Sequence, residues 1–507
     1  MLAALLALSL IPLAGLLLRV QLKGGVISGS DSFVVIDTFQ YLDWLRQAGE
    51  HVLIGSSHDM VDGARPFLHP GALISGGLHA LGFGVALAHL VWKPVAAAAL
   101  FAAALALARR FLDRREDRRL ALVLALFASS PVAAFVGWGP FDPHTKLQFD
   151  FLSGETWAGS YLWGYPFTAL AVACLPAALL AYERGRAGGP ARMLAWASGA
   201  GLLCSWLQPW QGATLAIVLV AAEVLELRRG RPALAAARDL VAPLAATALP
   251  LAYYLVLSLA DPAWELAGSV NDVERWPLWI TVVGLLPLVL PALPGYRLAA
   301  PDFGSIALRV WPVAALVVFF QPAGTFPAHA LQGMALPLSL LAVVGLRAWL
   351  RERPVRLWPA VVAVALLCAV GTAYRMDELR GAVNFGDQPF FFEPEERAAL
   401  RWLEQSPQAG GVLTTYYLGA AVPGYTGRET WVGVKSWTPD FFERQRAAED
   451  LIAGRLTPSE ARRVVRASGA RFLLVDCREH TRPHPSLRQV AGAPIQFGCA
   501  SVYQLEP

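Results

Sequence analysis

Acidic side chains that could act in catalysis lie in polar segments of a chain that is otherwise strongly apolar. The first such segment carries Asp37 four residues before Tyr41, within DTFQYLDWLRQAG. The second segment, residues 138–164, carries Asp150 and Glu155. A carboxylate at a membrane surface can take a proton from an incoming hydroxyl group, which is general-base chemistry. Asp37 could equally do no more than cap the N-terminus of a helix that lies on the membrane.

A membrane must position these segments, because the chain is too apolar for a water-soluble protein. Of its 507 residues, 56% are hydrophobic and 16% are charged, whereas soluble domains carry about 25% charged residues. The net charge is only +4, and the basic residues form short clusters between apolar runs, which argues against nucleic-acid binding. Apolar runs near the length of a bilayer span predict about eleven transmembrane helices. They are residues 2–20, about 81–108, 120–137, 166–182, a pair within 193–227, then 240–260, 278–293, 310–320, 331–346 and 358–373.

Arginine clusters orient the predicted spans. They occupy residues 109–119, 183–192, 227–232 and 347–356, in every second loop, as the positive-inside rule expects of a cytoplasmic face. An odd number of spans then places the C-terminal segment on the opposite face. We therefore predict a polytopic α-helical protein of the cell membrane. Its transmembrane domain (residues 1–373) has outward loops at about 21–80 and 138–164, and residues 374–507 form an extracytoplasmic α/β domain.

The C-terminal segment has the pattern of a small α/β domain. Helix signals at residues 393–405 and 457–469 include a proline in the first turn and a Thr457–Glu460 capping box. Four β-type runs alternate with them, at residues 412–417, 430–434, 471–477 and 501–505.

Two cysteines, Cys477 and Cys499, lie beside predicted strands of this domain. They are either two unrelated thiols or a disulfide formed in an oxidising compartment.

Histidines and acids of the first loop suggest a metal site, but their spacing matches no defined metal signature. These residues are His51, His58, Asp59, Asp62 and His69. We expect them to line a polar cavity or to face water, and no metal site is predicted. A divalent cation is the only cofactor considered.

The motif around Asp37 resembles the glycosyltransferase C-type (GT-C) superfamily. This superfamily includes protein O-mannosyltransferases, aminoarabinose transferases that modify lipid A, and bacterial arabinosyl- and mannosyltransferases. The resemblance rests on an aspartate four residues before a tyrosine in the first outward loop. Segments 69–94 and 326–347 and the tail from residue 390 also look like segments of bacterial members.

The resemblance implies roles for particular residues. In the superfamily a first-loop aspartate, here Asp37, deprotonates or orients the acceptor hydroxyl that attacks a sugar carried on a polyprenyl phosphate. A second acidic residue often lies in the second loop, where Glu155 and Asp150 are equal candidates. Related members carry arginines before the tenth span, where this chain has His329, a poorer clamp for a lipid phosphate. The expected substrate-binding residues are Tyr41, His58, Asp59, His144, Lys146 and His329.

The leading hypothesis is an inverting glycosyltransferase that moves a sugar from a polyprenyl-phosphate donor to a hydroxyl acceptor. The acceptor is a glycan, a lipid or a protein, membrane lipids surround the enzyme, and no nucleic acid takes part. Two alternatives remain: a multi-pass transporter or lipid flippase, and a non-catalytic scaffold with the same architecture.

Overall fold

The computed structural model describes residues 1–31, 35–61, 63–271, 275–298, 300–321, 326–351, 357–382, 389–478, 485, 487 and 490–505. The chain forms two compact units. The membrane unit comprises Met1–Leu10, Lys93–Val256 and Asp272–Gly381, and the loop–tail unit comprises Ile11–Trp92, Leu257–Asn271 and Ala382–Pro507. The first loop thus belongs to the same unit as the tail, whereas the sequence pattern grouped it with the transmembrane domain.

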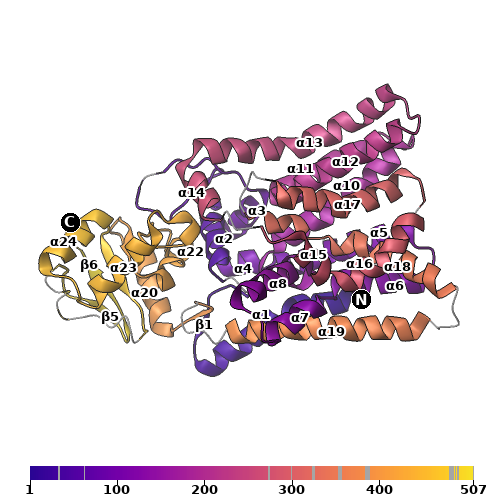
Figure 1. Cartoon of the computed structure of the whole chain (residues 1–507). Coiled ribbons are helices and arrows are strands. Elements are labelled where there is room, and N and C mark those ends of the chain that lie inside the picture. The colour runs from indigo at the N-terminus through magenta and orange to yellow at the C-terminus, as the bar shows by residue number, and fades with distance from the viewer. Residues whose placement is uncertain are drawn as a thin grey trace. The chain divides into compact units, whose positions relative to one another are not determined.

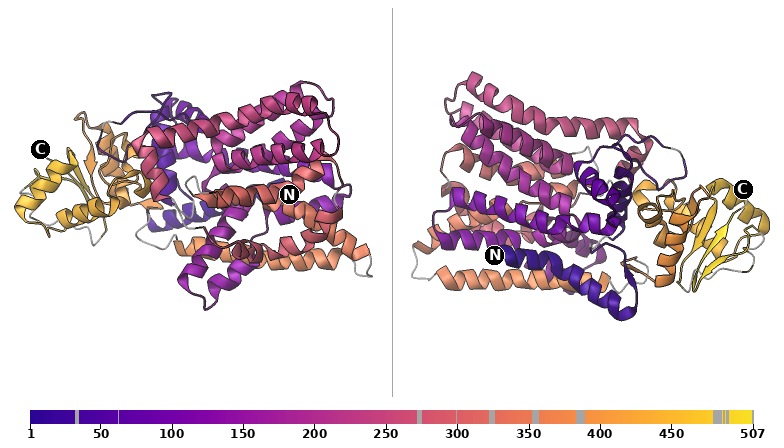
Figure 2. Two further views of the ribbon diagram at one scale, coloured as in Figure 1. Left: turned by 45° about the horizontal axis from the view of Figure 1, so that its top comes forward. Right: turned by 180° about the vertical axis from the view of Figure 1, so that it is seen from behind.

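The membrane unit consists of helices that run side by side in Figures 1 and 2. Among the described residues, eight helices are long and apolar enough to cross a membrane, or nine when the bent pair α15–α16 counts as one span. Helices α11 and α19 occupy the places of two further predicted spans. The elements are α1 (Leu2–Lys23, whose first half belongs here), α5 (Trp92–Phe111), α6 (Arg115–Leu126), α7 (Pro131–Trp138), α8 (Pro143–Thr156), α9 (Ala158–Gly164), α10 (Pro166–Arg186), α11 (Arg192–Leu207), α12 (Pro209–Leu227), α13 (Ala233–Ala260), α15 (Leu278–Gly284), α16 (Leu286–Leu298), α17 (Phe303–Phe320), the 3-10 helix η1 (Pro327–Leu331), α18 (Ala335–Arg351) and α19 (Leu357–Ala382).

Close packing of α16 against α18 depends on two glycines. A Cβ atom at Gly295 would lie 2.0 Å from the Leu341 carbonyl oxygen, and one at Gly345 would lie 1.9 Å from that of Pro291. Small residues let helix backbones approach closely inside a membrane, where the hydrophobic effect does not drive helix association. Helix α10 likewise packs on α11, and α12 on α17.

An ion-pair cluster joins the ends of α10 and α12. Glu223 on α12 is buried and accepts hydrogen bonds from the Arg186 guanidinium (2.8 Å) and the Tyr182 hydroxyl (2.7 Å). Arg186 also bonds Glu226 at 3.1 Å. Both glutamates thus pair with an arginine at the end of the neighbouring helix.

The loop–tail unit contains a four-stranded sheet in the order β3-β4-β6-β5, shown in orange and yellow in Figure 1. Strand β3 is parallel to β4, and the other two pairs are antiparallel. The elements are β1 (Val26–Ile27), α2 (Val35–Ala48), α3 (Pro70–Ala80), α4 (Val85–Leu90), α14 (Pro262–Val270), β2 (Phe391–Phe392), α20 (Pro394–Gln405), β3 (Val412–Leu413), α21 (Tyr416–Gly419), α22 (Val422–Thr426), the 3-10 helix η2 (Lys435–Trp437), α23 (Phe441–Ile452), α24 (Pro458–Ser468), β4 (Phe472–Val475), β5 (Ile495–Phe497) and β6 (Ala500–Gln504).

Most of the predicted tail elements are present. Helices α20 and α24 lie where the sequence places them, and the Thr457–Glu460 capping box is formed. The strand predicted at residues 430–434 is wrong, since Thr430 makes only an isolated bridge to Val412. Residues 435–437 then turn into η2. Cys477 and Cys499 form a disulfide with a Cα–Cα distance of 4.9 Å, which ties the end of β4 to the β5–β6 hairpin.

The first loop is attached to the tail by backbone pairing and helix packing. Strand β1 pairs antiparallel with β2, with Val26 opposite Phe392. Helix α2 packs on α22, where a Cβ at Gly424 would lie 2.9 Å from the Leu42 Cβ, so glycine allows the close approach. The Tyr425 hydroxyl of α22 donates to the Ser28 carbonyl at 2.7 Å. These contacts explain why the first loop and the tail form one unit.

Candidate functional site

Asp37 lies in the first turn of α2 and is half-buried. It is the third residue of the helix, so the prediction of an N-cap position is wrong. Tyr41, one turn later, stacks on His89 with a ring distance of 5.9 Å. Burial and the nearby negative charge of Asp37 together raise the pKa of Tyr41 well above its ordinary value. Asp37 therefore acts electrostatically on Tyr41, and Tyr41 stays protonated at neutral pH.

His58 and Asp59 attach the first loop to the tail. His58 is fully buried, its Nδ1 accepts from the Val434 amide at 3.3 Å, and burial lowers its pKa to about 3. Asp59 forms an ion pair with Arg444 of α23 at 2.7 Å. These contacts attach the first loop to the tail, and the predicted role of both residues in substrate binding stays a prediction.

The remaining polar residues of the first loop do not converge on a metal. His69 caps α3, because its Nδ1 accepts from the Ala72 amide at 3.1 Å, and His51 lies exposed. Asp62 lies outside the described residues. Within the described part of the chain, the group with metal-ligand spacing is Glu395, Cys477 and Cys499, and its two cysteines are joined in the disulfide.

In the membrane unit, Glu155 and His329 form a hydrogen-bonded pair. The Nδ1 of His329, on η1, lies 2.9 Å from a carboxylate oxygen of Glu155, on α8. Gln332 donates to the same oxygen at 2.6 Å. The carboxylate keeps 12% of its side-chain area exposed and the imidazole 28%. The structure thus brings together two residues that are 174 positions apart and that the sequence singled out for different reasons.

Amides and aromatic rings enclose this pair. Gln211 of α12 donates to the His329 carbonyl at 2.8 Å, which fixes the backbone of η1. Trp210 and Phe326 pack on the imidazole with ring distances of 5.1 and 4.7 Å. The Nδ1 of His329 faces Glu155, so its Nε2 is the second ring nitrogen available for a ligand.

Asp150 points away from this cluster. It lies five residues before Glu155 on α8, which rotates the two side chains about 140° apart around the helix axis. The Tyr374 hydroxyl of α19 donates to the Asp150 carboxylate, and the Arg375 guanidinium bonds its backbone carbonyl at 3.3 Å. Burial raises the pKa of Asp150. These contacts give Asp150 a packing role between α8 and α19.

His144 and Lys146 lie in the first turn of α8, which Asp142 caps. His144 is exposed and its Nε2 contacts the Gln148 amide at 2.9 Å. Lys146 is half-exposed, and its positive charge counteracts part of the rise in the pKa of Asp150. Neither residue forms a hydrogen bond or an ion pair with Glu155 or His329.

The sequence analysis missed Lys93, at the start of α5. Its ammonium is buried and donates to the carbonyls of Leu162 (2.9 Å) and Trp163 (2.6 Å), at the end of α9. A lysine beside an apolar run of span length was the available signal, because intramembrane charges are costly and are usually functional. It also missed the amides of Gln208 and Gln332, which bond each other at 3.3 Å.

Comparison with known proteins adds the fold family. No protein-family model matches the sequence, and no curated protein matches it. Among solved structures, the apo oligosaccharyltransferase of Archaeoglobus fulgidus matches 94% of this chain and 69% of its own, with a TM-score of 0.54 and 13% identity. An arabinofuranosyltransferase from Mycobacteria matches 100% of this chain and 41% of its own, with a TM-score of 0.52 and 17% identity.

The chain has the GT-C glycosyltransferase fold. The predicted class, a polytopic helical protein with a small C-terminal α/β domain, is therefore confirmed, while the number of spans stays a prediction. At 13% and 17% identity the likeness concerns the fold, and it says nothing of which sugar is moved.

Proposed function

We propose that this GT-C protein is a membrane glycosyltransferase that moves a sugar from a polyprenyl phosphate to a hydroxyl acceptor. Such a reaction needs a base for the acceptor hydroxyl and a polar site for the donor phosphate. The phosphate leaves already ionised, so no strong general acid is required. We assign Asp37 to the first task and the cluster around His329 to the second.

The observation that carries the proposal is the placement of Asp37 in a chain with this fold. Its carboxylate is half-buried in the first turn of α2, and its charge acts on the Tyr41 phenol. A helix N-terminus favours an ionised carboxylate, because the macrodipole is positive there. A half-buried carboxylate at a helix N-terminus fits proton removal from a hydroxyl group.

The donor site is proposed for the membrane unit. With Nδ1 of His329 held by Glu155, an imidazole that carries both protons donates its Nε2–H to a phosphate oxygen. Gln332 donates to Glu155 and Gln208 donates to Gln332, so the two amides order the site around His329. Glu155 then acts as a positioning residue for His329. One structure of the archaeal oligosaccharyltransferase, with a TM-score of 0.50 to this chain, holds a dolichol-phosphate and an inhibitory peptide, which agrees with a lipid-phosphate donor.

The Cys477–Cys499 disulfide supports an extracytoplasmic position for the loop–tail unit. Disulfides persist in oxidising compartments and are rare in the cytosol. Since the first loop and the tail share this unit, Asp37 would lie on the same outer side of the membrane.

The proposal is tested by Asp37→Asn in membranes supplied with labelled polyprenyl-phosphate sugars. We expect transfer to fall by about 10²–10⁴-fold, the usual cost of losing a general base. The matched control is Asp450→Asn, which changes a partly exposed carboxylate that pairs with Arg455. This variant should transfer sugar as the wild type does. Full activity of Asp37→Asn would overturn the assignment of the base. The proposed transferase activity itself would be refuted by two results together: the wild-type protein transfers no sugar, and cells that lack the protein have unchanged cell-envelope glycans.

A further inference from the structure

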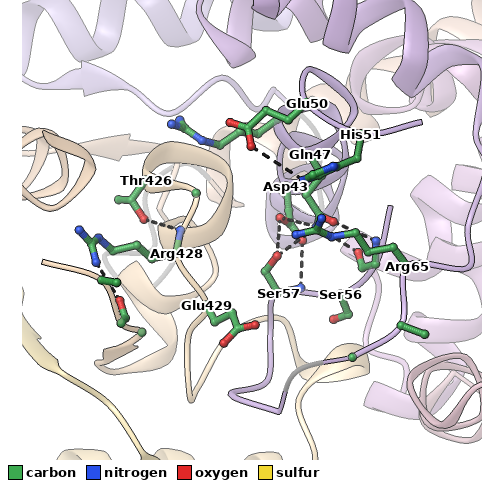
Figure 3. A pocket seen from close by; sticks show the side chains of 18 residues that line it. Asp43, Gln47, Glu50, His51, Ser56, Ser57, Arg65, Thr426, Arg428 and Glu429 are labelled. Atoms are coloured by element: carbon green, nitrogen blue, oxygen red, sulfur yellow. Dashed lines mark hydrogen bonds and ion pairs between the residues drawn. The ribbon is translucent and has the colours of Figure 1, made fainter. Parts of the chain in front are cut away.

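A polar pocket of about 690 Å³ lies within the loop–tail unit. Figure 3 shows it between the second half of α2, the loop that follows α2, and two tail segments at residues 409–411 and 426–429. Its volume lies in the range of about 300–1,000 Å³ found for small-ligand sites. Neither Asp37 nor Tyr41 lines it. On α2, Asp43 follows Asp37 by six residues, which places it about 9 Å further along the axis and about 120° around it.

A network of buried hydrogen bonds forms the floor of the pocket. Asp43 is buried, and its carboxylate accepts from the Gln47 amide and the Ser57 hydroxyl, both at 3.0 Å. Gln47 also bonds both backbone groups of Gly55, at 2.9 and 3.1 Å. The floor is therefore preorganised, and a ligand would not have to order it.

Two of the arginines that line the pocket already serve the fold. Arg428 donates to four tail carbonyls, among them those of Leu403 (2.7 Å) and Gly410 (2.8 Å). Arg46 pairs with Glu404 at 2.9 Å. Arg65, in contrast, is exposed on the rim, and Figure 3 places it beside Ser56 and Ser57.

The charges of the lining cancel. Asp43, Glu50 and Glu429 oppose Arg46, Arg65 and Arg428. A phosphate would meet three carboxylates and a divalent cation would meet three guanidinium groups, so neither ion is favoured.

The pocket has too few apolar side chains to bind most peptides. The only apolar side chains are those of Ala64 and Ala409, so a peptide would find no pocket for the side-chain anchors that give peptides their specificity. Five glycines also line the pocket, at positions 55, 63, 410, 411 and 427, and they expose backbone to a ligand. A neutral ligand rich in hydroxyl groups matches this lining, because its hydroxyls donate to carboxylates and accept from guanidinium groups.

We propose that this pocket binds a neutral oligosaccharide segment of the acceptor, a few sugar rings away from the hydroxyl that is glycosylated. The inference rests on the proposed function and deepens it, because it names a glycan as the acceptor class. The position of the pocket on the helix that carries Asp37 suits this role, since both would bind parts of one extended chain.

The test is calorimetric titration of the purified full chain with neutral hexasaccharides of glucose, galactose, mannose and arabinose. Gly63→Trp fills the pocket from its rim, where a Cβ meets nothing closer than 3.7 Å. Its matched control, Val61→Trp, changes an exposed residue of the same loop that does not line the pocket. We expect at least one hexasaccharide to bind the wild type and Val61→Trp alike. We expect Gly63→Trp to weaken that binding by about tenfold or more and Arg65→Ala to weaken it severalfold.

Three results would overturn the inference: no binding of any hexasaccharide to the wild type, equal binding by Gly63→Trp, or tighter binding of an octapeptide mixture than of every sugar. The proposed function is separable by the same titration. Asp37→Asn should bind the hexasaccharide as the wild type does and yet transfer no sugar. If the wild type binds a hexasaccharide but transfers no sugar, the pocket still binds glycans and only the proposed transferase activity is refuted.

Discussion

The two polar loops of this protein hold their charged residues in different ways. The second loop folds into α8 and α9 inside the membrane unit, and its acids bond side chains of other helices, such as Tyr374 and His329. The first loop leaves that unit and joins the tail through β-pairing and through His58 and Asp59. In the second loop, therefore, the contacts of an acidic residue depend on the face of α8 on which it lies. In the first loop, they depend on the folded tail.

This difference separates residues that look alike in the sequence. Asp150 and Glu155 are both acids of α8, yet one packs against α19 and the other holds a histidine. Asp37 and Asp59 are both acids of the first loop, yet one is half-buried at the start of a helix and the other pairs with Arg444. Substitutions of these residues or of their partners can test whether each acid has the role that its contacts indicate.

Among the variants that test this comparison, the largest effect is expected from the pair on α8. Glu155→Gln should lower the donor-dependent transfer rate by about 10–100-fold, because it removes the negative charge that holds the His329 imidazole. Losing a carboxylate that orients a metal-binding histidine costs a factor of this size. It should raise the KM for the donor lipid and leave that for the acceptor unchanged. Asp150→Asn should stay within about threefold of the wild type, because asparagine can still accept from Tyr374. Steady-state kinetics in which the two variants lose activity equally would contradict the comparison.

The next effect concerns the tail. Cys477→Ser should lower the free energy of unfolding of the sheet by about 3 kcal/mol, because the disulfide closes a loop across 22 positions. Hydrogen exchange at the amides of β4 and β6 in the full chain measures this change. Cys174→Ser, which changes a free thiol of α10, serves as the control and should leave these amides protected. Exchange in Cys477→Ser that matches the wild type would show that the disulfide does not stabilise the sheet.

A smaller, pH-dependent effect is expected from His58. Burial lowers its pKa to about 3 from about 6.5, so between these values the unfolded state binds the proton that the folded state does not. The free energy that neutral His58 contributes is thus complete above pH 6.5 and is lost as the pH falls through this range. At pH 5 the loss is about 2 kcal/mol.

Comparison with a variant isolates the effect of His58. Burial raises the pKa of Asp43 to about 6 and that of Glu396 to about 7, and these groups act with the opposite sign. Both groups contribute equally to the wild type and to His58→Asn, so their contribution cancels in the difference between the two free energies of unfolding. This difference should become smaller by about 2 kcal/mol from pH 7 to pH 5. A difference that does not depend on pH would refute the assignment.

The smallest effect is expected from the Asp59–Arg444 ion pair, which also attaches the first loop to the tail. The Asp59–Arg444 pair keeps 24% and 17% of its side-chain areas exposed. Arg444→Ala should therefore destabilise the loop–tail unit by only about 0.5–1 kcal/mol. Arg446→Ala, an exposed arginine on the same helix, should change nothing measurable. A large loss on Arg444→Ala would mean that this ion pair, rather than buried His58, holds the loop.

Most of the local structure could be predicted from patterns in the sequence. Apolar runs set the long helices, since backbone groups inside a membrane must bond within the helix. The capping box at Thr457 also followed from residues that are close together in the sequence. Asp37 was found from its spacing to Tyr41, and its first-turn position differs from the predicted cap by only two or three residues.

Which distant residues meet depends on how the whole chain folds. The Glu155–His329 contact spans 174 positions, and the pairing of β1 with β2 joins the first loop to a segment more than 360 residues away. No local pattern encodes such contacts, because they depend on the packing of many helices at once. The different contacts of Asp150 and Glu155, the absence of a strand at residues 430–434 and the burial of Lys93 are consequences of that packing. Periodicity fixes which face of an element is polar, but what that face contacts is decided by the elements packed against it.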